Sequence, residues 1–450
     1  MKTHLSYWFE VKHGLIKMEL PTEIIRNFQN FPETKRIFYE DAYVKNFESQ
    51  ILGIEKLNNY YYIVLKETAF FPESGGQEGD QGIITSSSAK CKVVDTQAID
   101  ERIIVHICDR IKGDFHVGDK VYGEIDWNLR YNRMRHHTGS HIVFAAMREV
   151  LEKEKLIYMG VHVGEELCRI DISYDKPISD SQMLEVERLA NNVILENRPV
   201  KIFYMDRKDA EKTYGDKLGI TEVTPTGLVR VVEIENWDVA LCSGTHVKST
   251  VEVGIIKILE RYKLKKGVQR IRFAAGHSAY NKISDLISKI SEIARILNTS
   301  PYEVDKRVKG IIARNNELKK EIEHLKKNIV KHEAKELLNN AVRINELKVI
   351  VKAISDADPY YLQEIVKNIV SKDPTAVVII GSIVDKVYIV GGAGKNAIKK
   401  GIKINELIDE AKNIIEGKGG GSPYRIQLVG TKKEKLSEVL RLYEKKLLKR

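Results

Sequence analysis

The sequence contains 450 residues, of which 43% are hydrophobic and 30% are charged, so it can fill more than one hydrophobic core and we expect two to four domains. Lysine and arginine outnumber aspartate and glutamate by 73 to 63, a net charge of +10, and a polyanionic partner and a lysine-rich genome explain this excess equally well. No run of about 18 apolar residues occurs, which argues against a membrane span. The four cysteines form no CxxC pair, so we expect no disulfide framework and a cytoplasmic location.

The first 127 residues divide into a short extension and a β-rich region. Residues 1–35 carry weak patterning. Residues 36–127 contain short runs of β-branched and aromatic residues, such as RIFYEDAYVKNFESQILGIE, YYYIVLKETAFF and RIIVHIC. Many short strands joined by glycine-containing turns are typical of a small barrel, so we expect a glycine-rich β-barrel domain.

Residues 128–280 mix helical and strand patterns. The stretch RYNRMRHHTGSHIVFAAMREVLEKE has apolar residues and histidines at helical spacing, which predicts a long helix. A second helix is expected in SDSQMLEVERLANNVILENR, with Ser179 or Ser181 as its N-cap. The runs KIFYMD and GLVRVVEIE predict strands, so this region is expected to be an α/β domain.

Residues 281–345 predict two helices separated by the breaker NTSP. Ser300 is expected to cap the second helix, with Pro301 in its first position and Glu303 completing a capping box. Apolar residues then recur at heptad spacing, which predicts a coiled-coil hairpin. Pairing within one chain is slightly favoured over pairing between two copies, because the first helix supplies a ready partner. A homodimer through the helical or the C-terminal region stays open.

Residues 346–450 predict a C-terminal α/β domain. TAVVIIGS and KVYIVGG are expected strands, INELIDEAKNIIEG is an expected helix, and a glycine-rich segment precedes a basic final helix. The expected fold class is therefore α+β multidomain, with a small β-barrel, an α/β domain holding zinc, a helical hairpin and a C-terminal α/β domain.

Two separated motifs predict a metal site. His137 and His141 stand four apart on the predicted helix, so their imidazoles share one face. Such a pair alone is weak, but Cys242 and His246 repeat the spacing about a hundred residues later. Two nitrogens, one thiolate and one further nitrogen form a zinc-type ligand set, so we expect one Zn²⁺ per chain. A purely structural zinc remains the alternative.

The motifs HTGSH and CSGTHVKSTVEVG resemble the editing domain shared by alanyl-tRNA synthetases and the free-standing AlaX proteins. A related domain occurs in threonyl-tRNA synthetases. AFFPESGGQEGDQG resembles the glycine-rich motif that precedes this domain in the alanyl branch, and GGAGKNAIKKG with GKGGGSPYRIQLVG resembles the C-terminal tRNA-binding domain. The resemblance runs from about residue 36 and identifies the sequence as similar to the long form of AlaX. It implies that no aminoacylation core precedes residue 36.

The resemblance implies hydrolysis of the ester between a wrong amino acid and the tRNA for alanine. A pocket for a methyl side chain cannot firmly exclude serine or glycine, so a second site must remove them. The implied activity is therefore trans-editing of Ser-tRNA(Ala), and the resemblance leaves open whether Gly-tRNA(Ala) is also a substrate. The alternatives are threonyl-type editing of Ser-tRNA(Thr) and a zinc-containing protein that only binds tRNA.

Site roles can be assigned to residues of the two motifs. The Gln77 amide is expected to hold water or the ester carbonyl, and Gly75 and Gly76 would allow close approach of the substrate. The Thr138 hydroxyl is expected to meet a substrate serine or a water, unless it is satisfied by its own helix. Asp238 could orient a histidine. A closed four-ligand shell leaves no place for water, so either one ligand such as His246 is weakly held or zinc only organises the site.

Basic residues in two regions are expected to meet tRNA. Arg130, Arg133 and Arg135 flank the histidines and could bind acceptor-stem phosphates, with a solvated helix face as the alternative. Lys418 and Arg425 lie in the C-terminal glycine-rich segment and could bind a folded region of tRNA by shape and backbone contact. Two weak modules on one chain would strengthen binding through effective concentration.

Overall fold

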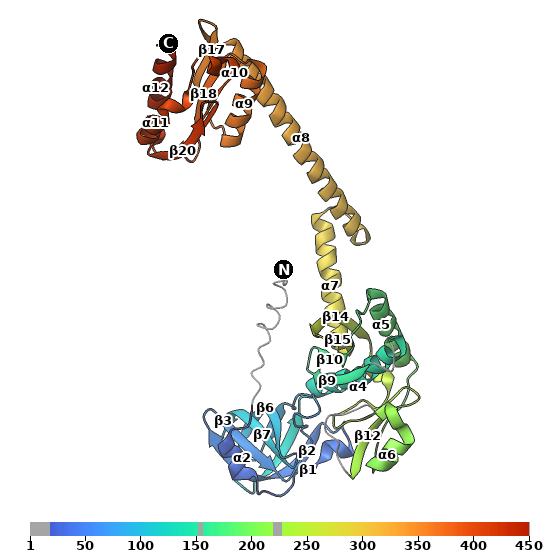
Figure 1. Cartoon of the computed structure of the whole chain (residues 1–450). Coiled ribbons are helices and arrows are strands. Elements are labelled where there is room, and N and C mark those ends of the chain that lie inside the picture. Colours follow the sequence, from blue (N-terminus) through green and yellow to red (C-terminus); the bar gives the residue numbers. More distant parts are fainter. Residues whose placement is uncertain (1–18, 152–155, 219–226, 450) are drawn as a thin grey trace. The chain divides into compact units, whose positions relative to one another are not determined.

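The computed structural model describes residues 19–151, 156–218 and 227–449, so the expectation for residues 1–18 lies outside the described residues. Two compact units are formed, Met1–Glu292 (unit 1) and Ile293–Arg450 (unit 2), and each is described by itself. Figure 1 labels their helices and strands. Within the described ranges, none of the helices has both the length and the apolar character that a bilayer crossing needs.

Unit 1 begins with a closed barrel whose six strands follow the order β2-β3-β7-β6-β5-β8, which confirms the predicted barrel. Side chains alternate along β3: Ile63 and Leu65 belong to the interior cluster, whereas Tyr62 and Val64 pack outside against α2. One expectation is wrong, since IFYE of the first β-like run forms a short helix. The elements are α2 (Thr22–Phe28), β1 (Lys35–Arg36), α3 (Ile37–Glu40), β2 (Asn46–Leu57), β3 (Tyr60–Leu65), β4 (Glu67–Thr68), β5 (Gly82–Thr85), β6 (Lys90–Ile99), β7 (Ile103–Lys112) and β8 (Lys120–Ile125).

The rest of unit 1 is built around helix α4, which carries the HTGSH motif. Asp126 caps α4 by accepting a hydrogen bond from the Leu129 N–H at 3.2 Å. Met134 and Ile142 of α4 share one core cluster with Phe273 of β15. The predicted second helix is α5, and Ser179 caps it in a capping box with Gln182. The elements are α4 (Trp127–Val150), β9 (Ile157–Val163), β10 (Cys168–Ser173), α5 (Asp180–Leu195), a 3₁₀ turn η3 (Thr250–Val253), β14 (Ile256–Lys265) and β15 (Val268–Ala275).

The predicted strands KIFYMD and GLVRVVEIE are β11 and β12, and they form a separate sheet in the order β11-β12-β13. One face of this sheet is covered through Val229 and Val231, which pack with Ala210 and Leu218. Strand β13 leads directly into the CSGTH motif, so this sheet fixes where the motif begins. The elements are β11 (Val200–Asp206), α6 (Arg207–Tyr214), η2 (Gly215–Leu218), β12 (Leu228–Ile234) and β13 (Asp238–Leu241).

Two long helices follow, α7 (Gly276–Ile296) and α8 (Val304–Asn339), with a 3₁₀ turn η4 (Pro301–Glu303) between them. Ser300 caps this turn by accepting a hydrogen bond from the Tyr302 N–H at 3.2 Å, and no capping box with Glu303 is formed. In α8 the apolar heptad seam is exposed over most of its length; Ile322, for example, is 52% exposed. The coiled-coil pairing and the homodimer stay predictions.

Unit 2 ends in a six-stranded sheet of order β16-β17-β18-β19-β21-β20, which confirms the predicted C-terminal α/β architecture. Helix α9 covers one face together with the end of α8, and α11 and α12 cover the other (Figure 1). The glycine-rich segment forms the edge pair β20 and β21, where a side chain at Gly421 would meet the Arg425 carbonyl oxygen at 2.2 Å. The elements are β16 (Val342–Ile344), β17 (Leu347–Ala353), α9 (Pro359–Lys372), β18 (Ala376–Ile383), β19 (Val387–Ala393), α10 (Lys395–Lys399), η5 (Ile404–Leu407), α11 (Ile408–Ile415), β20 (Gly417–Ser422), β21 (Arg425–Gly430), η6 (Lys433–Lys435) and α12 (Leu436–Leu448).

Candidate metal centre and its cavity

Two segments of unit 1 bring four metal-type donors together. Helix α4 presents His137 and His141 from successive turns, and the loop after β13 carries Cys242 and His246. One ligand atom from each residue lies within 4.8 Å of all the others. The Cys242 Sγ lies 3.3 Å from the Nε2 of both His137 and His246. Three imidazoles and one thiolate at this spacing fit a tetrahedral zinc ion.

Each imidazole is held by a partner on its other ring nitrogen. The His137 Nδ1–H donates to the Gln77 Oε1 at 2.8 Å, and the His141 Nδ1–H donates to the Asp238 Oδ2 at 2.9 Å. The His246 Nδ1 lies 3.1 Å from the Thr138 hydroxyl oxygen. Such partners fix the tautomer and ring orientation of metal-binding histidines and leave Nε2 for the ion. The orienting role expected for Asp238 matches this geometry.

The pKa values of three donors indicate which of them carries a proton in the metal-free chain. Burial raises the pKa of the Cys242 thiol, but the nearby His137 and His246 outweigh burial and bring it well below its usual value, so the sulfur is a thiolate. Burial lowers the pKa of His246 to about 3, which keeps this ring neutral. Burial also acts to lower the pKa of His141, yet its hydrogen bonds to Asp238 and Cys242 raise it to about 10. His141 therefore carries a proton at neutral pH in the metal-free chain.

Zinc binding at pH 7 is expected to release about one proton, because the ion must displace the proton of His141 whereas Cys242 and His246 are already deprotonated. Isothermal titration of Zn²⁺ into metal-free protein, repeated in buffers of different ionisation enthalpy, gives the number of protons released. The release is expected to fall as the pH rises past the His141 pKa of about 10. A proton count of zero at pH 7 would contradict the assigned charges.

The metal-type donors open on a cavity of about 780 Å³. His141 and Cys242 contribute to its wall, and so do Gly75 and Gly76 of the glycine-rich segment. Both glycines have positive φ, +57° and +77°, and a side chain at Gly76 would meet the Val161 carbonyl oxygen at 2.4 Å. Only glycine adopts these backbone conformations without strain, so both positions require it. The expectation that these glycines line a substrate site fits their place on the wall.

Gln77 is buried beside the metal-type donors and lies away from the cavity wall. Its side chain is 0% exposed and does not line the cavity. Its Oε1 accepts hydrogen bonds from the His137 Nδ1–H and from the Thr245 N–H at 3.1 Å, and its Nε2 donates to the Thr245 hydroxyl at 2.8 Å. In this structure the Gln77 amide holds a metal-type ligand. The expected contact with water or the ester carbonyl stays a prediction.

Two residues of the CSGTH motif itself were missed by the sequence reasoning. Thr245 fixes the orientation of the Gln77 amide, as just described. Gly244 is the closer constraint, because a side chain there would lie 1.9 Å from the His137 Cε1. The glycine at the centre of CxGxH was the available signal, since only glycine lets the imidazole of the facing histidine pack against the loop backbone.

Comparison with known proteins finds matches along most of the chain. Family models match residues 16–129 ("tRNA synthetases class II (A)"), residues 229–272 ("Threonyl and Alanyl tRNA synthetase second additional domain") and residues 346–449 ("DHHA1 domain"). The alanine–tRNA ligase of Ignicoccus hospitalis is 34% identical over 440 residues, which cover 97% of this chain and 46% of the ligase. That of Methanobrevibacter smithii is 35% identical over 413 residues, 92% of this chain and 46% of the ligase.

The chain is built from alanyl-tRNA synthetase-family domains. It spans about half the length of the curated relatives that it matches. The solved C-Ala domain of alanyl-tRNA synthetase from Aquifex aeolicus aligns with a TM-score of 0.22 and 23% identity, over 24% of this chain and 97% of that domain. The second family model contains Cys242 and His246 but not the two histidines of α4.

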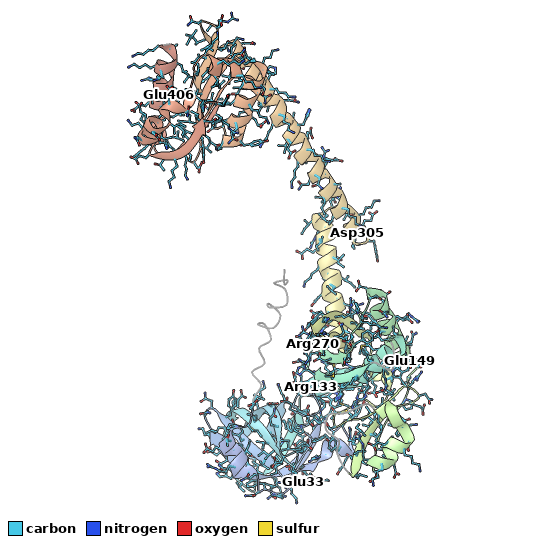
Figure 2. All side chains as sticks on the ribbon, in the orientation of Figure 1. Glu33, Arg133, Glu149, Arg270, Asp305 and Glu406 are labelled. Atoms are coloured by element: carbon cyan, nitrogen blue, oxygen red, sulfur yellow. The ribbon has the colours of Figure 1, made fainter. Side chains whose placement is uncertain are left out.

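Two of the three α4 arginines face inward. Arg130 is 0% exposed; its Nε donates to both carboxylate oxygens of Asp80, at 3.0 and 2.8 Å, and its Nη2 also pairs with Asp80. Arg133, labelled in Figure 2, donates to the Gly79 carbonyl at 2.9 Å and to the Glu78 carboxylate at 2.6 Å. The expected phosphate contacts of Arg130 and Arg133 are therefore wrong. These arginines fasten the glycine-rich segment to the metal helix.

The third α4 arginine, Arg135, is half-buried. Its Nε donates to the Glu252 carbonyl oxygen at 2.8 Å, and its guanidinium carbon lies 4.2 Å from the centre of the Tyr131 ring. In unit 2, Lys418 and Arg425 lie on the exposed pair β20–β21, and Arg425 donates to the Gln363 side chain at 2.6 Å. Contacts of these three cations with tRNA stay predictions.

Thr138 and His246 are buried side by side, away from the cavity wall. Thr138 is 0% exposed, and its hydroxyl oxygen accepts the Val247 N–H at 3.2 Å besides facing the His246 Nδ1. Thr138 does not line the cavity, and its expected contact with serine or water stays a prediction. His246 is 2% exposed and is the ligand that does not line the cavity. A substrate would therefore approach from the side of His141 and Cys242.

Replacing Gln77 by alanine is expected to weaken zinc binding by about ten- to a hundredfold, because it leaves the His137 Nδ1–H without its acceptor. Competition with a chromogenic chelator measures the zinc affinity of the folded variant. Gln97→Ala serves as the matched control, since the Gln97 amide binds Glu73 and Asp95 outside the site. Equal affinities of Gln77→Ala and Gln97→Ala would refute the positioning role.

Proposed function

We propose that this chain is a trans-editing hydrolase that deacylates mischarged tRNA for alanine, with Ser-tRNA(Ala) as the main substrate and Gly-tRNA(Ala) as a second one. The observation that carries the proposal is the cluster of His137, His141, Cys242 and His246, of which the first three line one cavity, in a chain of alanyl-tRNA synthetase-family domains. The curated relatives that it matches are alanine–tRNA ligases, which favours the tRNA for alanine.

The chain's own residues would bind and orient the ester. Gly75 and Gly76 give the wall a backbone surface that a substrate can approach closely. The Ser74 and Ser243 hydroxyl oxygens lie 3.2 Å apart on the same wall, beside Cys242, and offer donors to the amino acid or to the attacking water. A bound zinc would supply Lewis-acid polarisation to this end of the cavity if one of its four donors gave way to the substrate, and would otherwise organise the site.

Asp238 keeps the exposed side of the cluster in place. Its carboxylate accepts from the His141 Nδ1–H and also pairs with the Arg148 guanidinium. Both Asp238 and Arg148 are on the cavity wall. Because Arg148 fixes the Asp238 carboxylate, the carboxylate in turn would hold the His141 imidazole in place. Ser140 adds a second tie within α4, because its hydroxyl donates to the His137 carbonyl at 2.7 Å.

The purified chain can be tested with four charged tRNAs: Ser-tRNA(Ala), Gly-tRNA(Ala), Ala-tRNA(Ala) and Ser-tRNA(Thr). Loss of the labelled amino acid is followed by acid precipitation. Release from Ser-tRNA(Ala), with Ser-tRNA(Thr) spared, is the expected result. Faster release from Ser-tRNA(Thr) would replace the proposal by threonyl-type editing. Tight binding of all four without release would replace it by a tRNA-binding role.

A further inference from the structure

The cavity of the metal-type cluster has a second end that the proposed chemistry does not use. Its wall there is formed by Arg36 of β1, Tyr39 of α3, Tyr204 of β11 and Arg230 of β12. These four side chains come from three separate segments of unit 1. None of them is a metal-type donor.

A series of contacts connects the metal-type donors to this second end. The Arg230 Nη1 donates to the Cys242 carbonyl oxygen at 2.6 Å. The Arg230 guanidinium carbon lies 5.0 Å from the centre of the Tyr39 ring, and the Arg36 guanidinium carbon lies 5.8 Å from the same centre. Two cations therefore lie near the Tyr39 ring, and the nearer of them donates to the backbone of a metal-type ligand.

Tyr204 completes the surface from the neighbouring strand. It pairs with Arg230 in the antiparallel register of β11 and β12, so both side chains project from the same face of the sheet. The Tyr204 ring is 49% exposed. On the opposite face, Val229 and Val231 are buried against α6 and η2. Tyrosine and arginine side by side on the open face of a sheet form a surface on which an unpaired base can stack.

One buried group in this wall lacks a partner that a nucleotide could supply, and a second cation beside it has further donors. The Arg230 Nε is buried and has no hydrogen-bond partner among the described residues. Arg36 uses its Nη2 on the Glu33 carboxylate and the Glu101 carbonyl oxygen, and the rest of its guanidinium can still donate. Guanidinium groups bind phosphate oxygens with paired hydrogen bonds.

We propose that Tyr39 and Tyr204 form a stacking platform for the base of the 3′-terminal nucleotide of an aminoacylated RNA, and that Arg36 and Arg230 bind its phosphate. This inference rests on the proposed function, because the ester must lie at the metal end of the same cavity. A single-stranded 3′ end fits better than a duplex, since only an unpaired base exposes both faces for stacking.

The platform can be tested without any hydrolysis. A fluorescent single-stranded RNA ending in cytidine-cytidine-adenosine is titrated with the full-length chain, and the anisotropy is compared with that of the same RNA lacking its last base. The wild-type chain is expected to prefer the adenosine end by about tenfold, the strength of one stacked base. The double variant Tyr39→Leu/Tyr204→Leu is expected to lose this preference, and Tyr39→Phe/Tyr204→Phe is expected to keep it.

Tyr262→Leu/Tyr280→Leu is the matched control, because these tyrosines are 37% and 64% exposed in unit 1 and do not line the cavity. Arg36→Gln is expected to weaken the binding of both RNAs equally, since the phosphate is present in each. An unchanged preference in Tyr39→Leu/Tyr204→Leu, or no preference in the wild type, would overturn the platform.

Deacylation of Ser-tRNA(Ala) separates this inference from the proposed function. If the leucine pair raises KM and leaves kcat nearly unchanged, the platform is supported together with the editing activity. A wild-type chain that prefers the adenosine end but releases no serine would support the platform and refute the proposed function. A chain that releases serine, with the same KM in the leucine pair, would refute the platform alone.

Discussion

Replacing Cys242 by alanine is expected to lower serine release from Ser-tRNA(Ala) by about a hundredfold and to strip zinc in the presence of a competing chelator. The change removes the only thiolate of the cluster and its negative charge, which lies 3.3 Å from the Nε2 of both His137 and His246. Three imidazoles would remain, without the negative charge that the thiolate contributes. Metal analysis after chelator treatment and a deacylation assay measure the two effects.

Cys91→Ala is the matched control for this variant. Cys91 is 2% exposed in the interior of the barrel, and no metal-type cluster of the described residues includes it. Loss of its thiol is expected to leave zinc content and serine release close to the wild type. If Cys242→Ala retained full zinc occupancy under the chelator, Cys242 would not be a ligand.

Replacing Asp80 by alanine is expected to destabilise unit 1 by about 3–5 kcal/mol, because it leaves the charged Arg130 buried without its partner. The Asp80 and Arg130 side chains are 1% and 0% exposed. The Asp80 carboxylate also accepts the Phe71 N–H at 2.7 Å. Urea unfolding followed by tryptophan fluorescence reports this unit, since all three tryptophans belong to residues 1–292.

Two further variants serve as controls for Asp80→Ala: one breaks an exposed ion pair, and the other replaces the buried pair by apolar side chains. Glu185→Ala breaks an exposed ion pair with Arg188 on α5 and is expected to leave the stability of unit 1 close to that of the wild type. Asp80→Leu combined with Arg130→Met replaces the buried charges by apolar groups and is expected to recover much of the stability. A loss below about 1 kcal/mol in Asp80→Ala would mean that the pair does not hold α4 to the glycine-rich segment.

The metal-type cluster could be predicted because its members come in two local pairs. His137 and His141 share a helix face, and Cys242 and His246 follow a strand on one short loop, so sequence spacing already orients each pair. The barrel and the C-terminal sheet could be predicted for a similar reason, since alternating apolar residues define their strands. The glycine-rich strand β20 could not, because glycine has little intrinsic preference for strands and the pairing with β21 decides it.

The roles of the polar residues around the cluster depended on distant contacts. Arg130 and Arg133 look like a cationic helix face in the sequence, but their acids stand 50 and 55 residues away. Gln77 meets Thr245 across 168 residues. Neither helical nor strand periodicity predicts contacts between residues so far apart in the sequence. Residues that look available for a ligand in the sequence can therefore be buried and hydrogen-bonded within the fold.

The central claim is tested most directly by single-turnover deacylation of Ser-tRNA(Ala) and Ala-tRNA(Ala) in one reaction, with the two amino acids carrying different labels. The account predicts that the zinc-loaded chain releases serine and spares alanine, that chelation of the metal abolishes the release, and that added Zn²⁺ restores it. Release of both amino acids at the spontaneous rate, whether or not zinc is bound, would contradict it.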